Sequence, residues 1–336
     1  MDPAPKRPTI RDVATAAKVS SGTVSRVLNG KNWVSPEARA AVDAAIKRTG
    51  YRVNPHARNL AMSKSNTVAF LLTETQQVLF EDPNFARLVR GTSEALAARD
   101  MYSVLIMAGD AAEQDRALAY ISAGHVDGVL LGFSSTAGEP LIEALVQSHV
   151  PIVACGLPTG FEGRLGSVSA DDRSGTVAMV RYLRDAGRKH IATITGPLDL
   201  YGGSSRLDGY RSALGGEADE RLVVHGDYSR ASGARAAREL LARGIPFDAV
   251  FAGNDAMAAG AIDALEAAGV DVPGQVAVAG FDDNVIALQT DPQLTTVHQP
   301  FERISSEMVR LLTDIIGGEE PANITLPTSL VVRGSA

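Results

Sequence analysis

Six polar or aromatic side chains stand where apolar, strand-like runs of the sequence stop. They are Asn84, Phe85, Arg206, Tyr228, Asn254 and Asp282. Carboxylates, amides and a forked guanidinium group make paired hydrogen bonds to adjacent hydroxyls, and an aromatic ring stacks on the apolar face of a pyranose. This set of groups therefore suits a sugar. Asp255 and Asp283 stand beside two of these residues and could either bind the ligand or cap helices. Phe85 could instead belong to the core.

The stretch TIRDVATAAKVSSGTVSRVLNG at residues 9–30 holds a second group of side chains that could do chemistry. Apolar residues recur in it at helical spacing. They are Ile10, Val13, Ala14 and Ala17, then Val24, Val27 and Leu28. The pattern predicts two short helices, the second capped by Ser20 or Ser21. The outward face of the second helix is small, polar and cationic, and it consists of Gly22, Ser25, Arg26 and Asn29.

A third helix is predicted to begin at Ser35, where an N-cap residue is followed by Pro36 and an early acid. Its apolar stripe is Val42, Ala45 and Ile46, and it should end at Gly50. Two short helices joined by a tight turn and supported by a third make a helix-turn-helix. The second helix of that motif fits the major groove of DNA, where small side chains let the backbone approach the bases.

The net charge of −7 hides a division along the chain. Residues 1–64 hold twelve Lys and Arg against four Asp and Glu, a net of +8, so the remainder carries −15. A disordered basic tail would lack the periodic apolar residues that are interleaved with these charges. The chain is therefore predicted to be a basic head on an acidic body.

From Thr67 onward, apolar runs typical of buried parallel strands alternate with Ala-rich amphipathic segments. The runs are TVAFLL, SVLIMAG, DGVLLG, PIVACG, HIATITG, RLVVHGD, DAVFAG and QVAVAGFDD. Eight such units exceed the needs of one open sheet, and a break near Gly160 to Gly166 favours two similar lobes over a single barrel. The expected fold class is an all-α head followed by an α/β body of two doubly wound, parallel-sheet lobes.

The opening stretch, above all TVSRVLNG after VS, resembles the DNA-binding head of the lactose/galactose repressor (LacI/GalR) family of bacterial transcription regulators. The resemblance implies that Ser21 and Gly22 tune the choice of operator, while Thr23, Ser25 and Arg26 contact bases or phosphates. Pairing of Arg26 with a neighbouring acid is the alternative. The full set of contacts implied for double-stranded operator DNA is Thr9, Ser20, Ser21, Gly22, Thr23, Ser25, Arg26, Asn29, Asn54, Ala57 and Leu60.

Residues 53–65 follow the head, and the resemblance implies that they fold into a hinge helix on the operator. Asn54 suits the N-cap of that helix, and Ala57 and Leu60 share its apolar face. The family role of Leu60 is a wedge inserted into a minor-groove base step. Packing of Leu60 under the body is the alternative. Val53 stands where a proline is common, which affects the stiffness of the entry to the hinge.

The resemblance extends over the body, where it implies periplasmic-binding-protein-like lobes with a ligand in the cleft at the C-terminal ends of the strands. The stretch LTTVHQP and a helix near 301–316 should join the first lobe. The expected boundaries are 1–52 for the head, 53–65 for the hinge, 66–336 for the effector-binding and dimerisation domain, 66–164 plus 298–318 for the first lobe, and 165–297 plus 319–333 for the second.

The family match assigns Arg206, Asn254 and Asp282 as polar effector contacts and Tyr228 as the stacking aromatic. Gly156 stands where an aspartate is common, so a hydroxyl contact is missing or a bulkier sugar is admitted. The segments GPLDLYGGSSRLDGYR and FEDPNF resemble actinobacterial regulators of cellobiose or other β-glucoside uptake. This implies a repressor released from a palindromic operator by a mono- or oligosaccharide inducer. A corepressor-dependent regulator that binds a non-sugar metabolite is the alternative.

Other classes of function find little support. The chain has no GxGxxG after its first strand, no GxxxxGK[ST], no GxSxG and no metal spacing among its six histidines, so no enzyme, cofactor or metal is predicted. The lone Cys155 is expected in the core. No apolar run approaches roughly 18 residues, and no signal sequence opens the chain, so we expect a cytoplasmic protein without a membrane partner. A secreted sugar receptor would lack the head.

Assembly is the last expectation from the sequence. Reading a palindrome needs two heads, and the chain stops at SLVVRGSA without the heptad repeats that let some family members form tetramers. A homodimer is therefore predicted.

Overall fold

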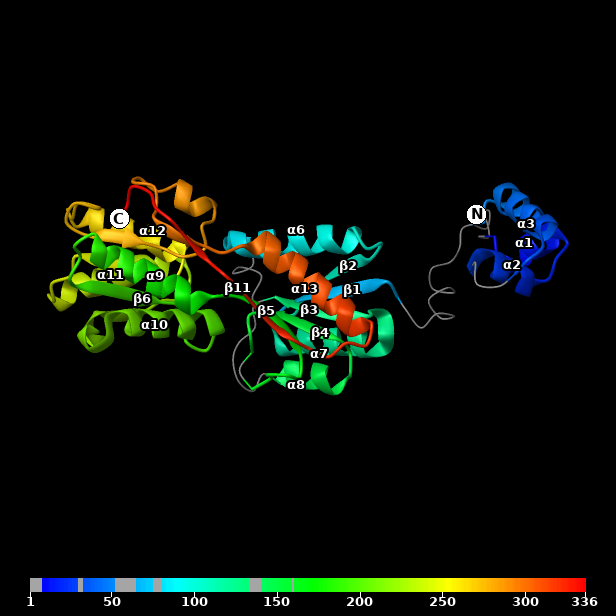
Figure 1. Cartoon of the computed structure of the whole chain (residues 1–336), viewed down its shortest axis with the longest axis horizontal. Helices are drawn as coiled ribbons and strands as arrows, with labels where there is room; N and C mark the ends of the chain where they lie inside the picture. The colour runs from blue at the N-terminus through cyan, green and yellow to red at the C-terminus, as the bar shows by residue number, and fades with distance from the viewer. Residues whose placement is uncertain (1–7, 30–32, 52–64, 75–79, 133–139, 159) are drawn as a thin grey trace, which may run out of the picture. The chain divides into compact units, whose positions relative to one another are not determined.

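The computed structural model describes residues 8–29, 33–51, 65–74, 80–132, 140–158 and 160–336. The chain forms two units, Met1–Ser65 and Asn66–Ala336 (Figure 1). Each unit has its own hydrophobic core. The hinge residues Asn54, Ala57 and Leu60 lie outside the described residues, as does Val53.

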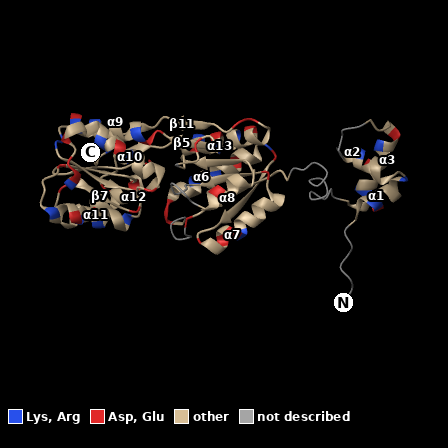
Figure 2. Ribbon diagram, turned by 90° about the horizontal axis from the view of Figure 1, so that it is seen from below, with Lys and Arg blue, Asp and Glu red and all other residues tan. Residues whose placement is uncertain are grey.

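The first unit contains three helices, α1 (Ile10–Ala17), α2 (Ser21–Asn29) and α3 (Pro36–Thr49). The apolar stripes predicted from the sequence meet at its centre. Its buried residues are Val13, Ala14, Val24, Val27, Val42 and Ala45. The helical head is therefore confirmed, and Lys or Arg residues lie on each of its three helices (Figure 2).

Capping side chains fix where α1 and α2 begin. At α1 the backbone amide of Thr9 donates to Asp12 Oδ2 at 2.7 Å, and the two residues form a capping box. At α2 the backbone amide of Thr23 donates to Ser20 Oγ at 3.1 Å. Of the two serines that could cap this helix, Ser20 is the one that does so, which leaves Ser21 on the exposed first turn.

Helix α3 begins and ends as its sequence predicts. Ser35 caps it, Pro36 opens it, and Gly50 ends it in the left-handed conformation with φ 67°. Near its C-terminus, Nη2 of Arg48 donates to the carbonyl oxygen of Ala16 at 2.6 Å. This bond ties α3 to the end of α1, so the third helix supports the helix-turn-helix.

The first lobe of the body is built on a parallel sheet of six strands in the order β11-β5-β4-β3-β1-β2. The strands are β1 (Thr67–Leu72), β2 (Tyr102–Met107), β3 (Gly128–Gly132), β4 (Ile152–Cys155), β5 (Gly166–Ala170) and β11 (Asn323–Leu326). One face packs against α6 (Pro83–Ala97) and α13 (Phe301–Ile316). The other face packs against α7 (Ala111–Tyr120), the turn of helix Ile121–His125, and α8 (Pro140–Gln147).

The second lobe has a smaller parallel sheet in the order β7-β6-β8-β9. Its strands are β6 (Ile191–Thr195), β7 (Val223–His225), β8 (Ala249–Ala252) and β9 (Ala277–Ala279). Helices α9 (Asp172–Asp185) and α10 (Tyr201–Leu214) cover one face, and α11 (Arg230–Arg243) and α12 (Asp255–Ala267) cover the other. Short 3-10 helices lie at Gly215–Glu217, Glu220–Leu222 and Val285–Leu288.

All eight predicted apolar runs form strands, and helices cover both faces of both sheets, so the doubly wound fold class is confirmed. Alternate residues of one strand face opposite layers. On β1, for example, Val68 and Phe70 pack toward α6 and α13, while Ala69 and Leu71 pack toward α7 and α8. A strand buried on both faces is apolar throughout, which explains why its sequence shows no polar alternation.

The boundaries between the lobes differ from the prediction. The break expected at Gly160 to Gly166 comes too early, because β5 still belongs to the first sheet and the chain crosses at Asp171. Within 319–333, β11 also joins the first sheet, although this segment was expected in the second lobe. The stretch LTTVHQP, expected in the first lobe, forms β10 (Thr296–His298) and pairs with β12 (Ser329–Val331) beside the second sheet.

Close packing explains why β5 was missed. Its sequence GSVSA is small and half polar, unlike the other strands. A Cβ atom on Gly166 would come within 2.9 Å of the Leu311 side chain on α13, so a larger residue there would displace that side chain. Ser167 and Ser169 are buried as well, and Ser167 Oγ donates to the side-chain oxygen of Asn323 at 2.9 Å.

Candidate functional site

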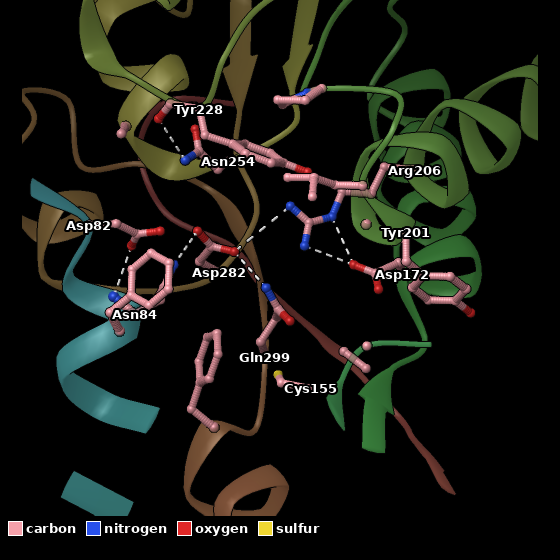
Figure 3. A pocket seen from close by; sticks show the side chains of 18 of the residues that line it. Asp82, Asn84, Cys155, Asp172, Tyr201, Arg206, Tyr228, Asn254, Asp282 and Gln299 are labelled. Carbon is pink, nitrogen blue, oxygen red and sulfur yellow. Dashed lines mark hydrogen bonds and ion pairs between the residues drawn. The ribbon is translucent and has the colours of Figure 1, made fainter. Parts of the chain in front are cut away.

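A cavity of about 460 Å³ lies between the two lobes of the body, beside the C-terminal ends of their strands (Figure 3). Cys155 and Ala170 end β4 and β5 of the first lobe, and Asn254 and Asp282 follow β8 and β9 of the second. The structure brings all six residues of the predicted ligand site to this cavity, including Asn84 and Phe85 from the first lobe.

The guanidinium group of Arg206, on α10, is buried in the cavity wall and held from several sides. Its Nε and Nη2 each lie 2.8 Å from Asp172 Oδ1, and its Nη1 donates to the carbonyl oxygen of Gly253. Its Cζ lies 3.8 Å from the centre of the Phe281 ring. Burial alone would lower the pKa of Arg206, but nearby carboxylates, above all Asp172 and also Asp282, raise it above its usual value. The group therefore stays charged.

Asp282 is the carboxylate at which groups from both lobes meet. Its Oδ2 accepts a hydrogen bond from Asn84 Nδ2 at 2.7 Å, and its Oδ1 accepts one from Gln299 Nε2 at 2.6 Å. Burial raises the pKa of Asp282 to about 7, even though Arg206 lowers it, and the nearby carboxylate of Asp82 raises it further. The site thus contains a buried carboxyl group that changes charge near neutral pH.

Tyr228 and Asn254 form part of the cavity wall on the second lobe. Asn254 caps α12 by accepting the backbone amide of Met257 at 2.9 Å, and its Nδ2 donates to the carbonyl oxygen of Tyr228 at 2.9 Å. The Tyr228 ring lies so close to Gly196 that a Cβ atom there would come within 2.1 Å of it. Burial raises the pKa of Tyr228 to about 12, so its hydroxyl is neutral. Asn254 thus uses both ends of its amide to position Tyr228 and α12.

The first lobe contributes the start of α6. Asp82 caps this helix by accepting the backbone amide of Asn84 at 2.8 Å, and burial raises the pKa of the Asp82 carboxyl group. Phe85 combines the two roles that the sequence left open, because it packs in the first-lobe core and also lines the cavity. Gly156, which follows β4, has φ 83°, a conformation that favours glycine at this position.

Asp255 and Asp283 are neither helix caps nor part of the cavity wall, so both alternatives considered for them are wrong. Asp255 is fully buried beneath the cavity wall, where it accepts the Thr296 hydroxyl at 2.5 Å. Asn254 is the residue that caps α12. Asp283 is bound by Arg333, whose Nη2 lies 2.6 Å from its Oδ1.

Sequence reasoning missed Asp172 and Gln299. The neighbouring Asp171 caps α9, where its Oδ1 accepts a hydrogen bond from the backbone amide of Ser174 at 2.9 Å. The side chain of Asp172 turns instead to Arg206 (Figure 3). Gln299 follows β10 at a strand end, so the rule that selected Asn254 could also have selected it.

The surface of the head that was predicted to contact DNA lies on α2. Ser21, Gly22 and Arg26 are exposed there, and Thr23 and Ser25 are half-buried. Within the part of the chain that the structure describes, no ion pair of Arg26 with an acid is found, and its contact with DNA stays a prediction. The side chain of Asn29 lies outside the described part.

Comparisons with known proteins agree with this architecture. Residues 9–54 match the model of bacterial regulatory proteins of the lacI family, and residues 180–336 match a periplasmic binding protein-like domain. The transcriptional regulator CelR of Thermobifida fusca is 44% identical, over 98% of both chains. A solved CelR–cellobiose complex has a TM-score of 0.78 and 42% identity, covering 98% of this chain and 100% of that one. The lac repressor dimer bound to operator and the anti-inducer ONPF has a TM-score of 0.82 and 26% identity, covering 98% and 99%.

A helix-turn-helix head joined to two doubly wound lobes with a cavity between them defines a ligand-responsive, DNA-binding transcription regulator. The chain belongs to the lacI family of bacterial regulatory proteins. Among the described residues, no helix is long and apolar enough to cross a membrane. Nor, in these same ranges, does any group of three or more His, Cys, Asp and Glu side chains gather in a way that could hold a metal ion.

Proposed function

We propose that the chain represses genes of carbohydrate uptake or utilisation and is released from a palindromic operator when a sugar enters the cavity. The observation that carries this proposal is a cavity wall that combines the charged fork of Arg206, the carboxylate of Asp282 and the ring of Tyr228. A volume of about 460 Å³ is enough for a whole small ligand. The similarity to CelR, solved with cellobiose, supports cellobiose or another β-glucoside as the first sugar to test.

The charge of the cavity favours a neutral ligand. Its wall contains two guanidinium groups, of which Arg206 is bound to Asp172 and Arg230 lies 2.8 Å from Asp263. The carboxylates of the wall are Glu74, Glu81, Asp82, Asp172, Asp227 and Asp282. A phosphorylated sugar or a nucleotide would add negative charge beside carboxylates whose pKa is already raised, such as those of Asp82 and Asp282. This favours a free sugar over an anionic metabolite corepressor.

The residues that bind the effector and the operator are part of the same proposal. Asn84, Phe85, Arg206, Tyr228 and Asp282 bind the effector, and Asn254 contributes by holding Tyr228 in place. On the head, α2 enters the major groove, and the DNA contacts are those that the family resemblance implies, including the hinge residues. The protein acts as a homodimer in the cytoplasm, where its DNA lies, and it has no enzymatic activity.

Operator binding in the presence of ligand tests the proposal. Palindromic DNA selected by the full chain from a random pool would be titrated by fluorescence anisotropy, with and without cellobiose and with cellobiose phosphate as the charged comparison. Cellobiose should weaken operator binding by about 5- to 150-fold, the usual range of such coupling, and the phosphate should have little effect. Stronger DNA binding with ligand would instead show a corepressor. No response to any free sugar would contradict a sugar effector.

A further inference from the structure

Asp255, the first residue of α12, lies beneath the cavity wall and binds two other segments of the second lobe. Its Oδ2 accepts a hydrogen bond from the backbone amide of Asn284 at 2.9 Å, which holds the turn that carries Asp282. Its Oδ1 lies 2.5 Å from the hydroxyl oxygen of Thr296 on β10, three residues before Gln299. Asp282 and Gln299 both line the cavity. Asp255 therefore fixes the segments that bring these two side chains to the ligand site.

No cation compensates the carboxyl group of Asp255. The residue is 0% exposed, and a Cβ atom on Gly280 would come within 2.5 Å of its Oδ1, so the space beside that oxygen is filled. In the described part of the chain, no Lys, Arg or His side chain forms an ion pair with it. The charged groups that face it from the neighbouring turn are Asp282 and Asp283, and both are acidic. A buried carboxylate without a cation is costly, and such a group takes up a proton instead.

The surroundings of the two buried carboxyl groups favour different charges. Asp282 lies 3.9 Å from Arg206 Nη1 and accepts hydrogen bonds from two side-chain amides, which favour its ionised form. Burial and the charge of Asp282 raise the pKa of Asp255 well above its usual value, although hydrogen bonds from Thr296 and Asn284 lower it. When the surroundings push the pKa values of two acids apart, one acts as the charged group and the other as the neutral one.

We propose that Asp255 keeps its proton at neutral pH and, as a neutral acid, positions the turn that presents Asp282 to the effector. The inference deepens the proposed sugar response and rests on it for the class of ligand. Because Oδ2 accepts the amide of Asn284, the proton lies on Oδ1, and Thr296 then accepts the bond that it would otherwise donate.

Loss of this proton would place a second negative charge beneath the turn. Asp282 and Asp283 already have positive φ there, 117° and 55°, a conformation that residues with side chains adopt only where their surroundings hold them. Repulsion between the carboxylates of Asp255 and Asp282 would move the turn away from the position that binds the effector. Effector binding should therefore require the proton on Asp255.

Asp255→Asn tests the neutral acid, because an amide has the same shape and cannot ionise. Its nitrogen donates to Thr296 and its oxygen accepts from Asn284, as the protonated acid does. Calorimetric titration of the full chain with cellobiose at pH 7 should give an affinity within about twofold of that of the unaltered protein. A loss of about tenfold or more, or a variant that fails to fold, would overturn the proposal, because an ionised Asp255 is not reproduced by an amide.

Asp283→Asn is the matched control in the same turn. Arg333 lies 2.6 Å from the Asp283 carboxylate and holds its pKa below the ordinary value, so that group is ionised. Removing its charge should lower the urea midpoint of unfolding at pH 7, whereas Asp255→Asn should leave the midpoint unchanged or raise it. If both substitutions lower the midpoint alike, Asp255 is ionised as well and the proposal fails.

The pH profile of binding separates this role from a purely structural one. Above neutral pH, the affinity of the unaltered protein for cellobiose should fall by up to about tenfold per pH unit, as one proton leaves Asp255. Asp255→Asn should remove this decline. The Cys155 thiol in the cavity wall also ionises at alkaline pH, so Cys155→Ser is titrated in parallel and should keep the decline. A decline that persists in Asp255→Asn would contradict the proposal.

Unfolding without ligand distinguishes a failure of this inference from a failure of the sugar response. A carboxyl group whose pKa is higher in the folded than in the unfolded chain stabilises the fold less as pH rises. The urea midpoint of Asp255→Asn, relative to that of the unaltered protein, should therefore rise between pH 7 and pH 9. If cellobiose does not bind but this rise is seen, the sugar class proposed above fails and the proton on Asp255 is supported. A constant or falling difference would overturn the proton on Asp255 whatever the ligand.

Discussion

Arg206 gains its role from neighbours that its own sequence motif does not contain. A guanidinium group has five N–H donors in a planar fork. Asp172 and the carbonyl oxygen of Gly253 occupy three of them, and the Phe281 ring packs against the plane of the group. The remaining donors are held in a fixed direction before any ligand arrives. Such preorganisation lowers the entropic cost of binding.

Arg206→Ala should leave operator affinity near that of the unaltered protein and remove the response to cellobiose, because the head does not depend on this cavity wall. Anisotropy titrations with operator, with and without cellobiose, give both quantities. Arg206→Lys is the second variant, since it keeps the charge near Asp172 and Asp282 but loses the fork. If Arg206→Ala still releases DNA at the original sugar concentration, the effector binds elsewhere in the body.

Asp282 should make the stability of the fold depend on pH. Its pKa of about 7 in the folded chain exceeds the ordinary value of 3.8, so the folded state binds a proton more tightly than the unfolded state. Stability therefore falls as pH rises between these two values. Asp282→Asn should stabilise the body at pH 8 relative to pH 5, by about 1–3 kcal/mol, because it removes a buried charge.

Urea unfolding at pH 5 and pH 8 measures this difference, in which pH-independent costs of the substitution cancel. Asp283→Asn is the control with the opposite sign. Burial raises the pKa of Asp283, but Arg333 lowers it further, so that it lies below its ordinary value. The Asp283 carboxylate therefore stabilises the fold at high pH. Equal effects of Asp282→Asn at both pH values would contradict the prediction.

The sequence predicted the members of the site better than their partners. Strands of a parallel sheet end at one edge, so residues such as Asn254 and Asp282 gather there whatever the details of packing. Asp172 stands two residues after the end of β5, but the rule could not select it because the sequence of β5 does not show the apolar pattern of a strand. Likewise, Asn254 has its amide engaged by Met257 and Tyr228, which depends on the loop conformation and not on the motif.

At the scale of the helix, α2 places Arg26 on the exposed face while Val24 and Val27 fill the core of the head. Arg26→Ala should cost about 1–3 kcal/mol of operator binding if the guanidinium group reads a base edge. The measurement is the ratio of the affinities for the operator and for random DNA at one salt concentration. An equal loss on both DNAs would show that Arg26 contacts phosphate only.

Helices α11 and α12 pack with their backbones in direct contact, which their Ala-rich sequences do not reveal. A Cβ atom on Gly260 would come within 2.0 Å of the carbonyl oxygen of Arg230, and one on Gly233 within 2.1 Å of that of Met257. Gly260→Ala should therefore destabilise the body by about 1–3 kcal/mol, the usual cost of overpacking. Gly216→Ala, which meets nothing within 4 Å, is the control for urea unfolding. Equal stability of the two variants would show that the helices can separate freely.

The same kind of packing explains which elements of the fold escaped prediction. Long apolar runs marked eight strands, because a strand buried on both faces needs apolar residues throughout. β5 has glycine and serine at three of its five positions, so its sequence does not show the apolar pattern of a buried strand. β10 and β12 pair over three residues each, and so short a pattern predicts little.

In the whole body, the chain crosses between the lobes after β5, β10 and β11, so the lobes can rotate only if these crossings twist together. Two of the crossings carry groups of the cavity, since Asp172 holds Arg206 and Gln299 donates to Asp282. Ligand contacts and the angle between the lobes are therefore linked through the same residues. A ligand that prefers one angle shifts the equilibrium by its difference in affinity, about 1–3 kcal/mol in typical systems.

The edge of the first sheet offers a surface on which two chains could pair. β2 is an edge strand, and it exposes Leu105 and Met107, two residues apart on one face, at 49% and 38%. Exposed apolar residues on an edge strand mark a surface that pairs with another chain. A palindromic operator presents two half-sites, and a dimer brings both heads to it with a high effective concentration of the second head. The proposed homodimer therefore has its best candidate contact at β2.

Leu105→Glu should convert the dimer to single chains at micromolar concentration, because a charge would be buried in the contact. Light scattering measures the mass, and Val332→Glu, at an exposed apolar residue of the second lobe, is the control. Operator binding should weaken by at least about tenfold, since the linkage of two heads is lost, whereas cellobiose binding should stay unchanged because the cavity is formed within one chain. If Leu105→Glu keeps the mass of two chains, the dimer contact lies on another surface. A mass near four chains for the unaltered protein would contradict the dimer itself.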